Sequence, residues 1–289
     1  MLKSFIPITA IVITLLTTSS YGSESLKLSG KPDDDKLHLT LIKEIVHRSD
    51  RFDRIEYIYK ETGDPAPSRI MADLELGKLS LIWSATSKEL EERYTPLYFP
   101  IYRGMLGMRI GLIHKENPRL LSNIRGKSDL QKFKICTGKT WPDTSILDAN
   151  QLQTAKSLKY PNIFEMMLAG NRCDFFARGV MEPFSEVKNH PHLPMAVDSH
   201  IMLRYRMPYM LFVSKGNIEL QSHLMEIIEE IFNDGTYEKM FFSDSEVKMA
   251  LSKAKLNERV IIDLDNPFLT EKAKSIPVKY FFDPLSERE

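Results

Sequence analysis

The stretch "IEYIYKETGDPAPSRIMADLELGKLSLIW", from Ile55 to Trp83, carries the pattern that decides the predicted fold. Its start is rich in Ile and Tyr, which predicts a strand, and Gly, Asp and Pro follow as turn residues. Ser68 can cap a helix that ends at Gly77, and the apolar run from Leu79 predicts a second, buried strand. Strand, helix and strand within about 30 residues form a βαβ unit, which implies a parallel sheet covered by helices.

The same pattern recurs in the second half of the chain, between two apolar segments that we expect to be extended. This arrangement predicts an α/β protein with two lobes, each a mostly parallel sheet with helices on both faces, joined by two crossing hinge strands. The predicted boundaries are 1–22 for a signal peptide, 23–108 and 214–289 for the first lobe with a C-terminal tail, and 109–213 for the second lobe. The elements behind this prediction are strands at 132–137, 157–160 and 173–178, helices at 143–155 and 163–168, and the extended segments 105–114 and 208–214.

The N-terminus has the layout of a secretory signal peptide. One positive charge at Lys3 precedes the uncharged apolar run from Phe5 to Leu16, and small residues around Ser20 and Gly22 suit a signal peptidase. An uncleaved membrane anchor is the alternative, but the apolar run is shorter than the ~20 residues that a spanning helix needs. We therefore expect cleavage near residue 22 and an exported, periplasmic protein.

The composition is that of an ordinary globular protein, with 43% apolar and 27% charged residues. The formal net charge is zero and no long basic run occurs, so nucleic acid is not an expected partner. Cys136 and Cys173 could form one disulfide in an oxidising compartment, or each could pack as a buried thiol, and the sequence leaves both open. Neither has a Cys or His at ligand spacing, so no metal site is predicted.

Gly138, Lys139 and Thr140 resemble the end of a phosphate-binding P-loop. That motif requires a glycine five residues before Gly138, and because Phe133 occupies this position, nucleotide chemistry is excluded. What remains is a strand, a glycine turn and a helix start at Pro142, whose free N–H groups suit an anion or a polar ligand. A well-capped helix without a ligand is the alternative.

Two further candidate sites lie at the carboxyl ends of predicted strands, where ligands bind in open α/β sheets. In "WSATSKELEER", the hydroxyls of Ser84 and Thr86 and the guanidinium of Arg93 suit a carboxylate. The alternative there is a surface helix in which Arg93 pairs with a Glu four residues earlier. In "CDFFARG", Arg178 ends an apolar strand and is either a ligand contact or part of a rim salt bridge. No Gly-x-Ser-x-Gly or His-Glu-x-x-His motif occurs, so no enzyme is predicted.

The chain contains, in order, a helix from Leu37 to Arg48 and the segments "ADLELGKLSLIWSATSKELEERYTPLYFP", "GMLGMRIGLI", "KFKICTGKTWPDTSIL", "MMLAGNRCDFFARGVME", "PYMLFVSKGN" and "NDGTYEKMF". Taken in this order, these segments resemble the bacterial extracellular solute-binding proteins of family 3, the group that contains the polar amino-acid receptors of ABC importers. The resemblance covers nearly all of the mature chain and lies in the order of the segments more than in any one motif. It implies a type 2 periplasmic-binding fold, with a ligand cleft between two lobes that close about a hinge.

In that family, hydroxyls after the first-lobe strand and an Arg a few residues later hold the ligand carboxylate, which corresponds here to Ser84, Thr86 and Arg93. The glycine turn of the second lobe corresponds to residues 138–140. Gly179 stands where the family places an Asp for the ligand ammonium, which argues against an unmodified α-amino acid. The usual aromatic motif is replaced by "KPDDDK". The remaining candidates for an aromatic platform are Tyr59, Trp83 and Trp141.

We therefore expect a monomeric periplasmic receptor that closes on a small polar, anionic solute for uptake through a membrane permease. In this hypothesis two arginines, one from each lobe, grip the acidic groups, and hydroxyls and a helix start complete the site. The expected ligand contacts are Arg93, Arg178, Ser84, Thr86, Thr140 and the helix start near Trp141. One alternative is a ligand-sensing partner of a membrane signalling protein. The other is an enzyme on the same fold, with Glu182 or Asp174 as acid or base. No cofactor is expected in the leading hypothesis.

Overall fold

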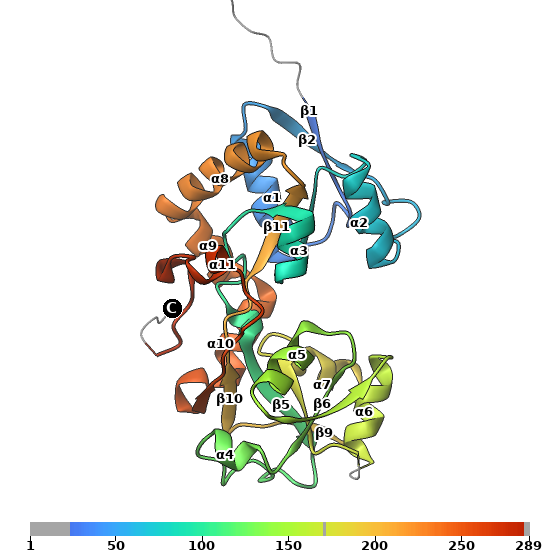
Figure 1. Ribbon diagram of the computed structural model, residues 1–289, viewed down its shortest axis with the longest axis vertical. Coiled ribbons are helices and arrows are strands. Elements are labelled where there is room, and N and C mark those ends of the chain that lie inside the picture. Colours follow the sequence, from blue (N-terminus) through green and yellow to red (C-terminus); the bar gives the residue numbers. More distant parts are fainter. Residues whose placement is uncertain (1–23, 170–171, 286–289) are drawn as a thin grey trace, which may run out of the picture.

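The computed structural model describes residues 24–169 and 172–285, and the predicted signal peptide lies outside these residues. Figure 1 shows two α/β lobes, one above the other, with the chain passing several times between them. The predicted two-lobed α/β architecture is confirmed. No helix in the described part of the chain is long and apolar enough to cross a membrane.

The first lobe is built around the βαβ unit that the sequence predicts. Strand β1 pairs in parallel with β2, and the N–H of Ser80 donates to the Lys27 carbonyl (2.8 Å), which joins β1 to the start of β3. Strand β11 returns from the second lobe and pairs antiparallel with both β3 and β4. The elements of this lobe up to the crossing are β1 (Glu24–Leu28), α1 (Leu37–Arg48), β2 (Phe52–Tyr57), α2 (Pro67–Glu75), β3 (Leu81–Ala85), α3 (Lys88–Arg93) and β4 (Tyr94–Pro96). Those after it are β11 (Tyr209–Ser214), α8 (Ile218–Asn233), α9 (Thr236–Ser243), α10 (Ser245–Ala254) and α11 (Glu271–Lys274).

Helix α2 begins two residues earlier than a cap at Ser68 requires. Ala66 is its N-cap residue and Pro67 occupies the first helical turn, so Ser68 lies inside the helix and the capping prediction was wrong. Proline suits this position because its missing N–H would have had no partner inside the helix. The predicted helix and its position between two strands are otherwise as expected.

The second lobe contains a mixed sheet in the order β12-β10-β5-β8-β6-β7, with β9 on β5. Strand β6 is parallel to β7 and β8, as the βαβ pattern predicts, whereas β5 is antiparallel to β8, β9 and β10. The antiparallel pairs arise because the chain enters this lobe along β5 and leaves it along β10. The elements are β5 (Met108–His114), α4 (Lys127–Leu130), β6 (Lys134–Gly138), α5 (Pro142–Ala149), β7 (Gln153–Ser157), α6 (Pro161–Leu168), β8 (Phe175–Gly179), α7 (Pro183–Asn189), β9 (Met195–Val197) and β10 (Ile201–Arg204).

Helix α5 is shorter than the predicted helix at 143–155. It ends at Ala149 because Asn150 caps it and Gln151 takes a positive φ of 60°, which a continuing helix does not allow. The next strand therefore begins at Gln153, four residues before the predicted one.

The C-terminal part of the chain crosses between the lobes twice more. Strand β12 (Val260–Asp263) pairs in parallel with β10, so it belongs to the sheet of the second lobe, although the sequence analysis assigned residues 214–289 to the first. Leu264 packs into the core of the second lobe, and five residues later Leu269 packs into the core of the first. Figure 1 shows this red segment at the junction of the two lobes.

A disulfide joins Cys136 on β6 to Cys173, just before β8. Their Cα atoms are 5.4 Å apart, and both residues are buried. Of the two possibilities that the sequence leaves open, the structure therefore shows the bridge. It ties together two strands whose carboxyl ends carry predicted site residues.

His38 is buried in the first lobe among aromatic rings. Its Nδ1 lies 3.0 Å from the Tyr102 hydroxyl, and its ring centroid lies 4.6 Å from that of Trp83. Burial disfavours the charged imidazole and lowers the pKa of His38 to about 4.

The buried His38 predicts a stability that falls in acid. The folded pKa of about 4 lies below the unfolded value of 6.5, so the unfolded chain binds more protons between these values. The stabilisation is complete above pH 6.5 and is lost as the pH falls towards 4. Between pH 7 and 4.5 we expect His38 to account for roughly 2.5 kcal/mol of lost unfolding free energy, measured by urea denaturation.

The variant His38→Asn should lack this part of the pH dependence, because it has no group that titrates in the window. His47→Asn, on an exposed position of the same helix, is the matched control. A pH slope in His38→Asn as steep as that of the wild-type protein would contradict the assignment.

Candidate functional site

A cavity of about 420 Å³ lies where the two lobes meet. Three separate parts of the chain form its walls: the segment after β3, the segment after β6, and the segment that follows β12. The lining residues are Thr86, Ser87, Lys88 and Glu89 from the first lobe, Lys139, Thr140, Trp141, Pro142, Ser145 and Ile146 from the second, and Asn266 and Phe268 from the third segment.

The first-lobe wall is held rigid by its own hydroxyl groups. The Thr86 hydroxyl donates to the Glu91 carboxylate (2.7 Å), and the Ser87 hydroxyl accepts the N–H of Leu90 (3.2 Å) as the N-cap of α3. Lys88 follows as the first residue of the helix, and its side chain is exposed. Lys88 forms no ion pair within 4 Å among the described residues, although its charge helps to lower the pKa of the Glu271 carboxyl. It is the lysine of the first lobe that lines the cavity.

The second-lobe wall depends on a close approach at Gly138. A Cβ atom at Gly138 would lie 2.5 Å from the indole of Trp141, so only glycine lets this ring fold back over the end of β6. The Thr144 hydroxyl donates to the Gly138 carbonyl (2.6 Å), which fixes the turn before α5. Lys139 lies in this turn with an exposed side chain and brings a second positive charge to the cavity.

The cavity contains three of the predicted ligand contacts, Thr86, Thr140 and Trp141. The other first-lobe candidates are engaged elsewhere and are not among the lining residues. Ser84 donates to the Ala85 carbonyl, Trp83 packs on His38, and the Tyr59 hydroxyl donates to Asp73 (2.6 Å). Burial of that hydroxyl, together with its hydrogen bond to Asp73, raises the pKa of Tyr59 to about 12.

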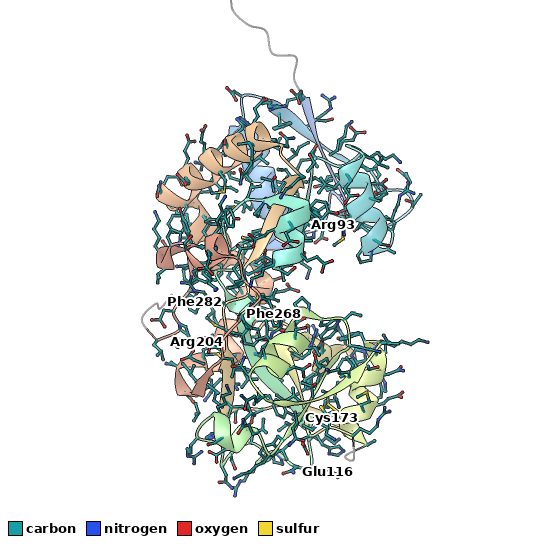
Figure 2. The ribbon with its side chains drawn as sticks, viewed as in Figure 1. Arg93, Glu116, Cys173, Arg204, Phe268 and Phe282 are labelled. Atoms are coloured by element: carbon teal, nitrogen blue, oxygen red, sulfur yellow. A yellow bond between two sulfur atoms is a disulfide. The ribbon has the colours of Figure 1, made fainter. Side chains whose placement is uncertain are left out.

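Arg93 and Arg178 already have partners within the protein. Arg93, at the end of α3, pairs with Glu75 of α2 (2.7 Å) instead of the Glu expected four residues earlier, and its guanidinium lies over Tyr94. Figure 2 shows Arg93 on the first lobe. Arg178 is 7% exposed and pairs with Glu182 (2.5 Å) and Glu186 (2.7 Å). Neither arginine lines the cavity.

Three aromatic rings surround the guanidinium of Arg178. Its Cζ lies 5.1 Å from the centre of the Trp141 ring, 5.3 Å from that of Tyr160 and 4.9 Å from that of Phe176. These are favourable cation–π distances. The side chain therefore supports the back of the Trp141 ring.

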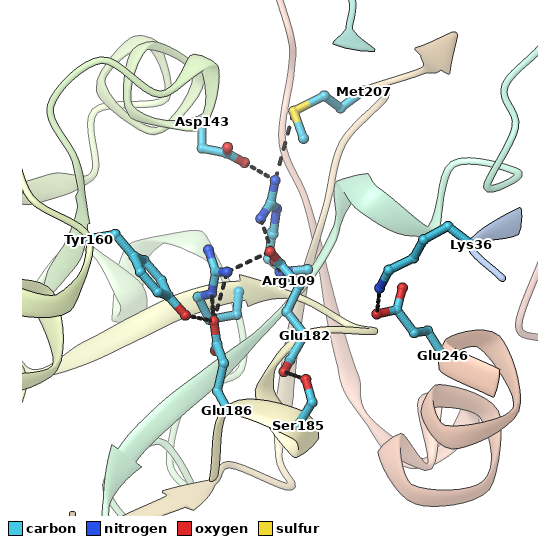
Figure 3. A network of polar contacts seen from close by, with 11 residues as sticks. Lys36, Arg109, Asp143, Tyr160, Glu182, Ser185, Glu186, Met207 and Glu246 are labelled. Carbon is cyan, nitrogen blue, oxygen red and sulfur yellow. Dashed lines mark hydrogen bonds and ion pairs between the residues drawn. The ribbon is translucent and has the colours of Figure 1, made fainter. Parts of the chain in front are cut away.

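A buried ionic network continues from this point to the hinge. Arg109, at the start of β5, pairs with Asp143 in the first turn of α5 (2.5 Å) and with Glu182 (3.4 Å), as Figure 3 shows. The Tyr205 hydroxyl, beyond the end of β10, also donates to Asp143. Burial lowers the pKa of Arg109, but the Asp143 and Glu182 carboxylates outweigh this and raise it above its usual value. The network connects both hinge segments to the helix that carries the second-lobe wall.

The two carboxylates considered as catalytic groups have structural contacts. Glu182 accepts hydrogen bonds from Arg178 (2.5 Å) and from the N–H of Gly179 (2.6 Å). Asp174 accepts the N–H of Lys134 (2.6 Å). Neither is among the lining residues of the cavity. Within residues 24–169 and 172–285, no group of three or more His, Cys, Asp or Glu residues is placed to hold a metal ion.

Among the lining residues that the sequence reasoning did not select are Lys88, Lys139, Asn266 and Phe268. Lys88 could have been predicted as a site residue, because it directly follows the hydroxyl-rich stretch after β3 and begins helix α3. Lys139 was noticed in the P-loop comparison but received no role. Nothing in the local sequence connects Phe268 with Lys88, because the two meet only after β12 has joined the second-lobe sheet.

No family model and no curated protein matches the chain. Solved structures do match. A probable amino-acid ABC transporter extracellular-binding protein from Bacillus subtilis is 14% identical over 78% of this chain and 100% of its own, with a TM-score of 0.57. The chain has the two-lobed fold of such solute-binding proteins.

Two reconstructed ancestral proteins share this solute-binding fold. An ancestral arginine-binding protein bound to arginine is 19% identical over 76% of this chain and 98% of its own, with a TM-score of 0.52. An ancestral amino acid-binding protein that is a precursor of cyclohexadienyl dehydratase is 15% identical over 76% of this chain and 95% of its own, with a TM-score of 0.50. At these identities the likeness concerns the fold, and the ligand has to be argued from the cavity itself.

Proposed function

We propose that the protein is a periplasmic receptor that closes its two lobes on a small anionic solute and delivers it to a membrane permease. The observation that supports this most directly is the cavity between the lobes, which places Lys88 on one wall and Lys139 on the other. Its volume of about 420 Å³ suits a small molecule. Delivery to a permease is proposed because the fold is that of solute-binding proteins, one of which is described as part of an amino-acid ABC transporter.

The two lysines would make binding of an anion favour the closed form of the protein. A carboxylate that contacts both ammonium groups binds the closed form better than the open form, and only such a difference shifts the equilibrium towards closure. Thr140 and Ser145 add hydroxyl groups on the second-lobe wall. Glu89 is the one carboxylate among the lining residues, so the two lysines outnumber it.

In this proposal the lysines take the place that the sequence analysis gave to Arg93 and Arg178. For either arginine to reach a ligand it would have to leave a carboxylate partner at 2.5–2.7 Å. For the buried Arg178 this is especially unfavourable, because Glu182 and Glu186 would lose their counter-charge. In the part of the chain that the structure describes, Lys88 and Lys139 form no ion pair within 4 Å that a ligand would have to replace.

The proposal is tested by calorimetry on the purified mature protein. Glutamate, succinate and 3-phenylpropionate serve as anionic probes, and arginine as a cationic one. The variants Lys88→Gln and Lys139→Gln should each weaken anion binding about tenfold, the effect of losing one charge-assisted hydrogen bond. Lys132→Gln, beyond the opposite end of β6, is the control and should bind as the wild-type protein does. Arginine binding tighter than any anion, and unchanged in both lysine variants, would refute the proposal.

A further inference from the structure

The segment from Leu264 to Leu269 is a short connection between the two lobes. At its start, the N–H of Leu264 donates to the Arg204 carbonyl (2.9 Å), which continues the β10–β12 pairing. At its end, Leu269 is 2% exposed in the core of the first lobe. The few residues between them therefore run along the junction, with both ends fixed in different lobes.

The second-lobe end of this segment is fixed by the buried side chain of Asn150. Its Nδ2 donates to the Asp265 carbonyl (2.7 Å), and its Oδ1 accepts the N–H of Asp265 (3.2 Å). Asn266 then donates to the Arg206 carbonyl (2.8 Å) in the hinge and accepts the N–H of Phe268 (3.0 Å). The backbone immediately before Phe268 is thus held by hydrogen bonds on both sides.

The first-lobe end is fixed to the same residues that form the cavity wall. The Phe268 carbonyl accepts the N–H of Lys88 (3.1 Å). The Thr270 hydroxyl donates to Glu91 (2.7 Å), whose other oxygen accepts the Thr86 hydroxyl. Because Lys88 and Phe268 are hydrogen-bonded through their backbones, the two side chains start from neighbouring, fixed positions of the wall.

The side chain of Phe268 remains 40% exposed although its neighbour Leu269 is buried. Of the exposed large apolar side chains in the described part of the chain, it is the one that lines this cavity. Figure 2 shows Phe268 where the two lobes meet. Trp141 lines the same cavity from the second lobe. The cavity therefore combines two lysines with an aromatic ring from each side of the junction.

We infer that Phe268 selects the non-ionic part of the solute, so that the preferred ligand is an anion with an aromatic or other flat apolar group. The inference rests on the proposed anion-binding function. The carboxylate of such a ligand meets Lys88 and Lys139, and its apolar group packs against Phe268 and Trp141. Aromatic contacts of this kind bury apolar area and add specific ring–ring attraction. A small acyclic anion gains from the lysines alone.

The test compares two carboxylates of the same charge, 3-phenylpropionate and propionate, by calorimetry. In the wild-type protein 3-phenylpropionate should bind more tightly. Phe268→Ala should weaken its binding about 20-fold and leave that of propionate within a factor of two. Phe268→Leu should restore part of the preference, because it keeps an apolar side chain at the same place. Lys88→Gln should weaken both probes equally.

Two controls separate a ligand contact from a structural effect. Val278→Ala changes another exposed apolar residue of the C-terminal segment, 74% exposed, and should leave the ratio of the two affinities unchanged. Melting temperature reports folding, and Phe268→Ala should melt within a few degrees of the wild-type protein because so much of the ring is exposed.

The possible outcomes distinguish the inference from the proposed function. An unchanged affinity ratio in Phe268→Ala, with both probes still weakened by Lys88→Gln, would overturn the role of Phe268 and leave the anion receptor standing. Equal affinity of the wild-type protein for both probes would do the same. If neither these carboxylates nor glutamate or succinate binds the wild-type protein at millimolar concentration, or if Lys88→Gln changes no anion affinity, the proposed function fails and the inference fails with it. If glutamate or succinate binds but 3-phenylpropionate does not, only the inference fails.

Discussion

Removal of the Cys136–Cys173 disulfide is expected to lower the free energy of unfolding by about 4 kcal/mol. The two cysteines are 37 residues apart, so the bridge closes a loop of that size in the unfolded chain. Without it the unfolded state gains the conformational freedom of the open loop, and this gain grows with the logarithm of the loop length. The double variant Cys136→Ala/Cys173→Ala avoids a remaining free thiol.

Guanidinium chloride denaturation at neutral pH measures this change. The wild-type protein with its disulfide reduced is the matched control, because it has the same chain without the bridge and should unfold close to the midpoint of the double variant. A loss below about 1 kcal/mol would mean that the unfolded chain is already restricted in this region. The double variant also tests whether the disulfide helps to position the cavity wall, because β6 leads to Trp141 and β8 contains Arg178, which packs on the Trp141 ring.

Arg109→Met is expected to lower the free energy of unfolding by about 3 kcal/mol, at the low end of the effects seen when one partner of a buried ion pair is removed. Arg109 is 4% exposed in its side chain, and Asp143 is 13% exposed. The variant leaves Asp143 with the Tyr205 hydroxyl but without a counter-charge. Because Glu182 keeps its ion pair with Arg178, we expect the loss of unfolding free energy to lie at the low end of this range.

Denaturation of three variants tests this prediction. Arg109→Met/Asp143→Asn should recover part of the loss, because the uncompensated carboxylate is gone. Arg204→Met removes a half-buried arginine that pairs with the exposed Asp263 (2.6 Å) and should cost less than about 1 kcal/mol. If Arg109→Met and Arg204→Met lower the free energy of unfolding equally, the prediction that burial increases the cost of losing the Arg109 ion pairs is wrong.

The local pattern of the sequence was sufficient for the main elements of the fold. The βαβ unit around α2 and the glycine turn before α5 depend on periodicity and on turn residues, which act over a few neighbours in the chain. The same reasoning placed Thr86, Thr140 and Trp141 at the carboxyl ends of β3 and β6, and all three line the cavity. Exact helix ends were less predictable, as Pro67 and Gln151 show.

Side-chain partners were harder to predict because they are chosen in three dimensions. Arg93 pairs with Glu75, 18 residues away, on a neighbouring helix, although a Glu was available four residues before it. Arg178 did have a signal, since Glu182 follows at a spacing of four, but its burial among three rings depends on how α5 and α6 pack on β8. A charged residue at a strand end therefore predicts a ligand contact only when its partners within the protein are known.

Local patterns along the chain were enough to predict two α/β lobes, with hydroxyls and a glycine turn at the ends of particular strands. The pairing of Cys136 with Cys173, the ion pairs of both arginines, and the position of Lys88, Lys139 and Phe268 around one cavity depend on the folded arrangement. The difference lies in the range of the interactions. Periodicity and turn chemistry are properties of adjacent residues. Phe268, in contrast, reaches the cavity wall beside Lys88 only because β12 pairs with β10, whose partner residues lie 59 positions earlier in the chain.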